Sequence, residues 1–290
     1  MGRRYDTLSF LSDYGTDDEF VGVVHSVVRS IAPHLTTVDV THGIPPHDVR
    51  AGGLTLARSA QYLCPGVVLA VVDPGVATSR RAVAIEVGNG ESVLVGPDNG
   101  LLAPAVALVG GATRAVSLTR TDYHLPAPGP TFAGRDLFAP VAAHLANGVD
   151  LGEFGEAVDP STLLPGVMPV SAADDDGLHA EVLWVDRFGN IQLNVGPGEL
   201  GDIVGQVGDR CQVRSSGSSR PVVRVVAFDE VPAGGLGLLV DSYGLATLVV
   251  DRASAAADLG VSAGDALVLA PTVDGSGSVT RVELGRSETV

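Results

Sequence analysis

The first half of this 290-residue chain alternates between strand-like and helix-like runs, and no other feature of the sequence restricts its fold as strongly. Apolar residues recur at helical spacing over 18–32, 48–63 and 134–148. The intervening extended segments are 5–11, 35–40, 66–72, 82–87 and 92–96. One of them, GVVLAVV at 66–72, is apolar enough to be a strand covered on both faces. The alternation predicts an α/β domain with a mostly parallel sheet flanked by helices.

From about residue 160 the pattern changes. Pro, Asp and small residues dominate 159–177, which is typical of a linker. Short β-like runs follow at 179–186, 190–195, 221–228, 235–242, 245–251, 265–271 and 279–284, and only 252–260 looks helical. We therefore predict a smaller all-β barrel as the C-terminal domain. The predicted divisions are an α/β domain at 1–165, a linker at 166–178 and the barrel at 179–290; RSSGSSRP at 214–221 is typical of an exposed hairpin loop.

Composition excludes several classes of protein. All 18 basic residues are arginine, so no lysine can form a Schiff base, anchor pyridoxal phosphate or bind phosphates in a Walker-A motif. The net charge of −16 disfavours a nucleic-acid surface, which needs clustered cations. No apolar run approaches the roughly 18 residues of a membrane span. Cys64 and Cys211 lie too far apart in sequence to suggest a disulfide framework, and we find no signal peptide, so we expect a cytoplasmic protein.

Polar turns follow four of the predicted strands, at 12–18, 41–48, 72–75 and 96–100. In an open α/β sheet, ligands bind beyond the carboxyl ends of the strands, so these turns predict a binding site. A metal-dependent hydrolase built on Asp13, Asp17 and Asp73 is a weak alternative, because no His or Cys ligand spacing accompanies these carboxylates. Helix capping explains Asp17 and Asp18 better.

Six segments, taken in order along the chain, are similar to motifs of one enzyme family. They are FLSDYGTDDEFVG, VDVTHGIPPHDVRAG, VVDPGVATSRRAVAI, VGPDNGLL, TFAGRDLFAPVAAHLA and VDRFGNIQLN. With them the chain resembles, over nearly its whole length, the S-adenosylmethionine hydroxide adenosyltransferases. These enzymes are also called adenosylmethionine hydrolases and are related to fluorinases and chlorinases. The resemblance implies hydrolysis of S-adenosyl-L-methionine to adenosine and L-methionine, by in-line attack of water or hydroxide on C5′ of the adenosyl group.

The resemblance also implies a catalytic pair, Asp73 and Arg80. A sulfonium is already an activated leaving group, so the reaction needs no metal, cofactor or covalent nucleophile, only a dry pocket that positions one water behind C5′. Asp73 would accept the proton or a hydrogen bond of that water, and Arg80 would compensate the charge. Halogenating relatives carry tyrosine where this chain has Asp73, and a long inserted loop where it has only 88–92. Both differences favour hydroxide over halide; a surface ion pair after a strand is the structural alternative.

One residue departs from the pattern of the family. Its hydroxide-transferring members have histidine in a TFHGRD motif, where this chain has Ala133. Loss of a positioned proton acceptor could lower the rate by roughly 10²–10⁴-fold. Three outcomes stay open: Asp73 and Arg80 suffice with an extra water, His47 substitutes for the missing imidazole, or the protein binds adenosylmethionine or adenosine with little or no turnover.

The remaining candidate residues come from the resemblance alone. In the first domain, Asp13 would bind the ribose hydroxyls. Thr131, Phe132 and Gly134 would line the ribose and the nucleophile pocket, together with Ala133. Asp18 would be an acid at the methionine end or a structural acid. Asn99 would contact the substrate, with turn geometry as an equal alternative. A neighbouring subunit of a homotrimer would supply Asp186, Asn190 and Ser242 to bind the methionine. Phe188 of that subunit would pack beside the adenine, and the backbone of Val250 and Arg252 would contact the methionine and the adenine. Core packing is the alternative for Phe188. Tyr243 stands where halogenating relatives have arginine, which puts the carboxylate contact of the methionine there in doubt.

Overall fold

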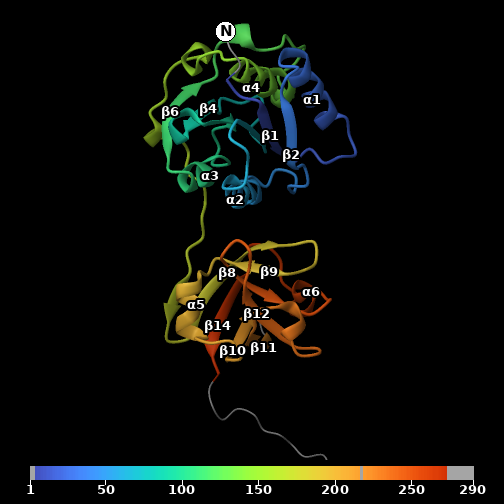
Figure 1. The fold of residues 1–290 in the computed structure, drawn as a ribbon, viewed down its shortest axis with the longest axis vertical. Helices are drawn as coiled ribbons and strands as arrows, with labels where there is room; N and C mark the ends of the chain where they lie inside the picture. The colour runs from blue at the N-terminus through green and yellow to red at the C-terminus, as the bar shows by residue number, and fades with distance from the viewer. Residues whose placement is uncertain (1–3, 216–217, 273–290) are drawn as a thin grey trace, which may run out of the picture. The chain divides into compact units, whose positions relative to one another are not determined.

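The extended runs of the first half form strands that pair into one six-stranded sheet (Figure 1). The computed structural model describes residues 4–215 and 218–272. The strands are β1 (Thr7–Ser12), β2 (Thr36–Thr41), β3 (Val67–Val71), β4 (Ala82–Val87), β5 (Ser92–Pro97) and β6 (Ala112–Ser117). Their order is β2-β1-β3-β5-β4-β6, and only β4 runs antiparallel to its neighbours. The prediction of a mostly parallel sheet is confirmed.

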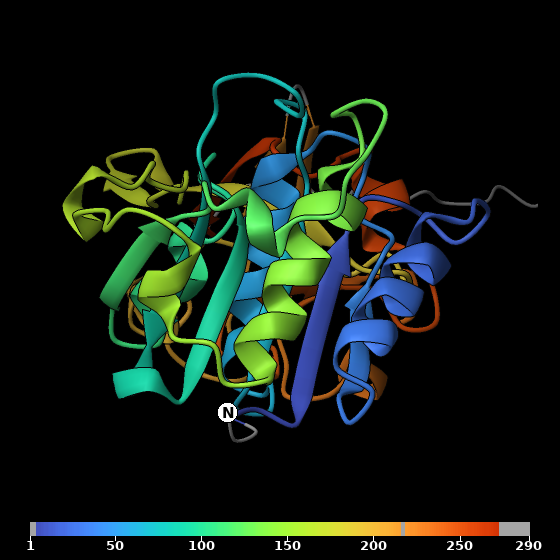
Figure 2. The ribbon, with the colours of Figure 1, turned by 90° about the horizontal axis from the view of Figure 1, so that it is seen from above.

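Helices cover both faces of this sheet. They are α1 (Phe20–Ile31), α2 (Val49–Ala60), α3 (Ala103–Leu108) and α4 (Ala139–Ala146). Helices α1 and α4 pack together on one face and α2 and α3 on the other, and Figure 2 looks onto the first pair. Adjacent residues Phe10 and Leu11 of β1 belong to two different apolar cores, because successive strand side chains point to opposite faces. Every residue of β3 is buried, as predicted.

Three elements of the first half were not predicted as they occur. Helix α3 and strand β6 lie within 103–117, where the sequence pattern predicts no element. The helix predicted at 134–148 begins with a π-helical turn, η3 (Gly134–Phe138), before α4 starts. Such turns widen a helix locally and occur often at functional sites.

The preference for helix capping by Asp17 and Asp18 was wrong. The residue at the N-cap of α1 is Glu19, whose side chain makes no capping hydrogen bond. Both aspartates are exposed. The helix begins at Phe20, so neither of them occupies the cap position.

The strands of the second half close into a barrel. They are β8 (Gly177–Val185), β9 (Ile191–Leu193), β10 (Arg210–Ser215), β11 (Ser218–Arg224), β12 (Leu236–Val240), β13 (Ala246–Val249) and β14 (Ala266–Pro271). Neighbours follow in the order β14-β10-β11-β12-β13-β9-β8, and β14 also pairs with β8, which closes the ring. The interior is apolar, with Val182, Ile191 and Leu248 fully buried. The predicted all-β barrel is confirmed.

The chain divides into two compact units after Met168. Within the segment expected as a linker, 166–178, lie strand β7 (Ala172–Asp174), which pairs with β8, and the first residues of β8 itself. The segment expected as an exposed hairpin loop, 214–221, is mostly strand: its described residues belong to the antiparallel pair β10–β11, and β10 itself was not predicted. The run at 279–284 lies outside the described residues.

Helix α6 (Ala255–Leu259) lies within the predicted helical segment 252–260. A second helix, α5 (Pro197–Ile203), contradicts the expectation that this was the only one. The α5 segment is short and glycine-rich, so its periodicity is weak. No helix in the described part of the chain is long and apolar enough to cross a bilayer.

Candidate active site

Asp73 and Arg80 form a buried ion pair just beyond the carboxyl end of β3. Nε of Arg80 donates to the two carboxylate oxygens of Asp73 at 2.8 and 3.0 Å, and Nη2 donates to Oδ2. The side chains are only 5% and 15% exposed, respectively. Cζ of Arg80 also lies 5.2 Å from the centroid of the Phe138 ring. A shielded pair with several hydrogen bonds is stronger and more rigid than an ion pair at the surface.

The turn that follows Asp73 folds back on itself, so that the side chain of Arg80 reaches the carboxylate of Asp73. The hydroxyl of Thr78 donates to the carbonyl of Gly75 at 2.6 Å and accepts the N–H of Arg80 at 3.3 Å. Between them, Ala77 has a left-handed backbone with φ of 64°. A residue other than glycine in this conformation carries strain of about 1 kcal/mol or more, and such strain is concentrated at functional sites.

Tyr14, in the turn after β1, belongs to the same site. Burial raises the pKa of its phenol well above the usual range, the carboxylates of Asp13 and Asp73 raise it further, and Arg80 opposes them. The phenol therefore stays protonated at neutral pH and can donate a hydrogen bond. Its oxygen lies against Gly134, because a Cβ placed there would be only 2.1 Å from it. Only glycine leaves room for this hydroxyl.

The ring of Tyr14 packs in an aromatic cluster with Phe20 and Phe132. The ring centroids of Tyr14 and Phe132 are 5.7 Å apart, those of Tyr14 and Phe20 5.6 Å, and those of Phe20 and Phe132 5.0 Å. The predicted residues Phe132 and Gly134 thus lie with Tyr14 at the start of the π-helical turn. Ala133, at the N-cap of that turn, contributes only a methyl group.

Asp13 is oriented by a backbone contact. Its Oδ2 accepts the N–H of His47 at 2.9 Å. His47 has a left-handed backbone with φ of 68°, and it is exposed. The structure therefore connects His47 to the site through its main chain; it records no hydrogen bond of this imidazole in the described part of the chain.

The other candidates of the first unit differ in how they are held. Nδ2 of Asn99 donates to the carbonyl of Val72 at 2.9 Å, and its Oδ1 accepts the N–H of Leu101 at 3.2 Å. These contacts fit the turn-geometry role, since they fix the backbone next to Asp73. Asp18 and Thr131 are exposed, and among the described residues no hydrogen bond ties either side chain to the other candidates.

In the second unit, four of the predicted residues line one hollow of about 480 Å³. Its lining consists of Phe188, Asn190, Phe228, Val250, Asp251, Arg252, Ala253 and Ser254. Phe188 is 78% exposed, so core packing does not explain it. A large exposed aromatic ring beside a hollow is typical of a surface that stacks on a planar ligand.

A tight turn holds two further candidates together. Asp186 accepts the N–H groups of Phe188 at 2.8 Å and Asn190 at 2.9 Å through Oδ1, and Nδ2 of Asn190 through Oδ2 at 2.8 Å. Ser242 lies in the turn between β12 and β13, is exposed, and does not line the hollow. The structure thus brings Asp186 to Asn190 but not Ser242 to either.

Comparison with known proteins identifies the family. Residues 8–155 match the SAM hydroxide adenosyltransferase N-terminal domain, and residues 180–268 match the C-terminal domain of the same family. The chain belongs to the SAM hydroxide adenosyltransferase family. The recognition made from the six motifs is confirmed.

Relatives within this family are similar over nearly the whole chain. An (R)-S-adenosyl-L-methionine hydrolase of Salinispora arenicola (strain CNS-205) is 45% identical over 260 residues, which cover 90% of this chain and 96% of that protein. One from Thermus thermophilus is 41% identical, covering 88% and 96%. Fluorinases are more distant, at 28–29% identity over about two thirds of this chain. The crystal structure of an uncharacterized conserved protein from Thermotoga maritima matches with a TM-score of 0.84 and 30% identity, covering 91% of this chain and 99% of that one.

Two residues of this family member's sites were missed by the sequence analysis. Tyr14 was passed over because only its neighbour Asp13 matched a carboxylate of the family motif, yet it stands within the quoted SDYG segment. Phe228 was assigned to a β-like run, but it lies in a short 3₁₀ turn and lines the hollow with Phe188. An aromatic residue at the end of a predicted strand, 221–228, was the sequence signal for Phe228.

The alternative of a metal site at Asp13, Asp17 and Asp73 is not supported by the arrangement of the described residues. Within the described residues, one group alone has three potential ligand atoms close together, and it consists of His25, Asp39 and His42. Asp13, Asp17 and Asp73 do not form such a group. The carboxylate of Asp73 is bound by Arg80 instead.

Proposed function

We propose that this chain hydrolyses S-adenosyl-L-methionine to adenosine and L-methionine, with Asp73 and Arg80 positioning the attacking water. The observation that carries the proposal is their buried, multiply bonded pair beyond β3. The names of the relatives that are 41–45% identical over most of the chain support the same reaction.

The reaction follows from the chemistry of the sulfonium. An oxygen lone pair of the water forms the new bond to C5′ while the C5′–S bond breaks. The electron pair of the broken bond goes to the sulfur and neutralises its positive charge. Methionine leaves as a neutral thioether. The water loses one proton, which Asp73 accepts and passes to solvent. Because the leaving group needs no activation, positioning and exclusion of bulk water supply the catalysis, and neither a metal nor a cofactor is required.

The charge of the site selects water over halide. A halide next to the Asp73 carboxylate would be repelled by several kcal/mol in a poorly solvated pocket. Arg80 offsets part of that repulsion, but its Nε and Nη2 already bind Asp73. A neutral water that donates to the carboxylate meets no such penalty.

Tyr14 supplies a polar group where Ala133 does not. Its protonated hydroxyl, set against Gly134, can donate to the water while Asp73 accepts from it. Two such contacts fix the orientation of the remaining lone pair. The alternative of a binding protein without turnover rested on the missing imidazole at residue 133, and no observation favours it now.

The rest of the substrate would be held by both units. Asp13, oriented by the N–H of His47, suits the cis-diol of a ribose as a two-oxygen acceptor. We place the adenine and methionine ends at the Phe188–Val250 hollow of a neighbouring chain in a homotrimer, as the resemblance implied. Asp186 and Asn190 stand in the turn beside it.

The cellular location belongs to the same proposal. We place the protein in the cytoplasm, where thiols stay reduced. Both cysteines are free: Cys64 is exposed and Cys211 buried. Reduced cysteines of this kind are typical of intracellular proteins.

Incubation of the purified chain with each sulfonium epimer of S-adenosyl-L-methionine tests the function. The relatives' names specify the (R) epimer, so we expect adenosine and methionine in equal amounts from at least that one. Absence of adenosine and methionine after incubation with both epimers would contradict the proposal.

The Asp73→Asn variant tests the mechanism. We expect turnover to fall by roughly 10²–10⁴-fold, because the proton acceptor is lost, while substrate affinity stays within about tenfold. Asp98→Asn is the matched control, because Asp98 is equally buried and its carboxylate binds Arg81 at 2.8 Å and the N–H of Leu164, not Arg80. Both variants lose the charge of a buried carboxylate that pairs with an arginine, so unfolding temperatures separate stability from catalysis. Full activity in Asp73→Asn would remove the mechanism.

A further inference from the structure

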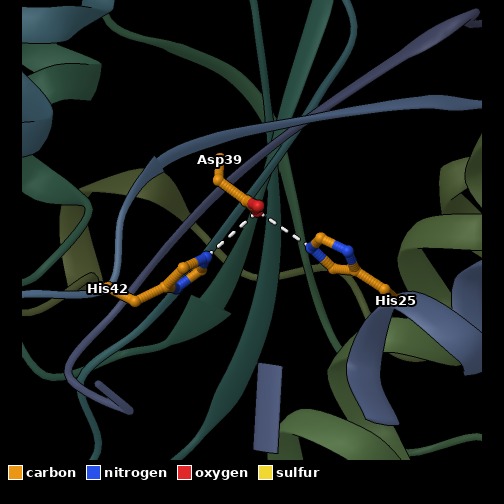
Figure 3. Close-up of side chains that lie close together, drawn as sticks. All are labelled: His25, Asp39 and His42. Carbon is orange, nitrogen blue, oxygen red and sulfur yellow. Dashed lines mark hydrogen bonds and ion pairs between the residues drawn. The ribbon is translucent and has the colours of Figure 1, made fainter. Parts of the chain in front are cut away.

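A second cluster of polar side chains lies at the edge of the first sheet, apart from the Asp73–Arg80 pair. Asp39 projects from β2, the edge strand, and His25 comes from α1 (Figure 3). His42 follows the end of β2. Figure 3 shows both imidazoles directed toward the carboxylate of Asp39. Nε2 of His25 lies 2.9 Å and Nε2 of His42 lies 3.0 Å from the same oxygen, Oδ1.

One nitrogen of this cluster is buried without a satisfactory partner. His42 is only 7% exposed. Its Nε2 lies 3.0 Å from Oδ1 of Asp39, but it has no hydrogen-bond partner among the described residues. Buried polar atoms are rarely left unpaired, so a ligand atom is expected at this position.

The second nitrogen of His42 is already held. Nδ1 lies 2.7 Å from Oγ of Ser12, which also accepts the N–H of Tyr14 at 3.3 Å. When Nδ1 carries the proton and donates to Ser12, the lone pair of Nε2 is free and faces the Asp39 oxygen. Histidines that bind metals have this arrangement, with the outer nitrogen donating to an oxygen. The Phe10 ring, 4.6 Å away between centroids, packs against the imidazole and fixes its plane.

We propose that His25, Asp39 and His42 bind one divalent transition-metal ion of the Zn²⁺ class. Two imidazole nitrogens and one carboxylate oxygen are a common zinc ligand set, and the same ligands suit Co²⁺ and Ni²⁺. The three ligand atoms lie within 4.8 Å of one another. Around a tetrahedral ion with bonds of about 2.0 Å, ligand atoms are about 3.3 Å apart, so small side-chain shifts admit the ion.

The charge and exposure of the cluster fit a three-ligand site with an open position. A carboxylate between two imidazoles supplies one negative charge to the ion and leaves two neutral nitrogen ligands beside it. Asp39 and His25 are partly exposed, which leaves one side of the ion to water and gives it a path of entry. The inference does not rest on the proposed function, because none of the three residues belongs to the substrate site.

Metal titration of the full chain, freed of metals and of any purification tag, tests the proposal. Calorimetry with Zn²⁺ alone should give one ion per chain. Co²⁺ should develop the visible absorption of a nitrogen-ligated, four- or five-coordinate ion. Acidification to about pH 5 should release it, since protonated imidazoles cannot bind metals.

Variants connect the binding to these residues. His25→Gln and Asp39→Asn change partly exposed side chains, and each should weaken Zn²⁺ binding by more than about tenfold. His179→Gln is the matched control, because His179 pairs with Asp174 at the same 2.9 Å but without a third ligand. Its binding should equal that of the unchanged chain. Absence of a one-to-one site, or unaltered binding in both His25→Gln and Asp39→Asn, would overturn the proposal.

Discussion

At the scale of single residues, the first-unit site depends on the contact between Tyr14 and Gly134, which are 120 positions apart in sequence. The phenol needs the missing Cβ of Gly134 to reach its place. Three residues other than glycine in the candidate site turns, His47, Ala77 and Arg252, have left-handed backbones. Strain of this kind persists only where surrounding contacts enforce it, and it marks both candidate sites independently of their chemistry.

Tyr14→Phe tests the role of the hydroxyl. The phenyl ring preserves the aromatic cluster, so the fold should be unchanged, while the donor to the water is lost. We expect kcat to fall by about 10- to 100-fold with KM nearly constant, which is the pattern of an interaction made in the transition state. Steady-state kinetics measure both constants.

Tyr62→Phe is the control for that variant, because Tyr62 is 72% exposed and outside the site. Its kinetics should equal those of the unchanged chain. An equal kcat in Tyr14→Phe would show that Asp73 alone orients the water.

At the scale of elements, the π-helical turn η3 places Gly134 beneath the phenol and then continues as α4. If a regular α-helix began at Gly134, the side chains of 134–138 would point in directions different from those in the π-helical turn. The turn after β3 performs the matching task on the other side, since its internal hydrogen bonds return Arg80 to Asp73. In our proposal these two elements lie on either side of the attacking water.

Gly134→Ala tests this close packing. A methyl group there would lie 2.1 Å from the Tyr14 oxygen, so the tyrosine must move. We expect a loss of stability of about 1–3 kcal/mol, measured by denaturant unfolding, together with a loss of activity. Adding Tyr14→Phe should recover part of the stability, because it removes the closest atom.

Gly22→Ala serves as the comparison, since nothing lies within 4 Å of a Cβ at that helical position. Stability there should be equal or higher, as alanine favours helix over glycine. A Gly134→Ala variant as stable as the unchanged chain would contradict the packing argument.

At the scale of the whole molecule, the question is how the two units cooperate. Each has its own core and carries one part of the candidate site. The first unit has the acid–guanidinium pair and the second has the hollow with the exposed Phe188. We propose that the two parts meet between neighbouring chains of a trimer. In that arrangement, two different inactive variants can complement each other, whereas with a site within one chain they cannot.

Co-expression of two inactive variants tests that prediction. Asp73→Asn inactivates the first unit, and we expect Phe188→Ala, at an exposed position, to weaken the second without unfolding it. In randomly mixed trimers, about one site in four would combine two unaltered halves, so about a quarter of the activity should return. Sedimentation of the unchanged chain should give the mass of three copies. No recovered activity in mixed trimers would place the whole site within one chain.

Local sequence patterns determined the classes of structure. Periodicity within single segments predicted the strands and helices around the sheet, because the spacing of apolar residues reports which face of an element is buried. The buried strand β3 followed from GVVLAVV alone. Asp73 and Arg80 could be paired from sequence because they lie seven residues apart in one turn, and the family motifs pointed to both.

Only the tertiary structure decided what depends on distant segments. The contact of Tyr14 with Gly134, the hollow shared by Phe188, Phe228 and Val250, and the approach of His25 and His42 to Asp39 join residues that no local pattern relates. The closure of the barrel by β14 and β8 is of the same kind. Side chains that meet across a fold are selected by packing and register, and these are properties of the assembled chain rather than of any one segment.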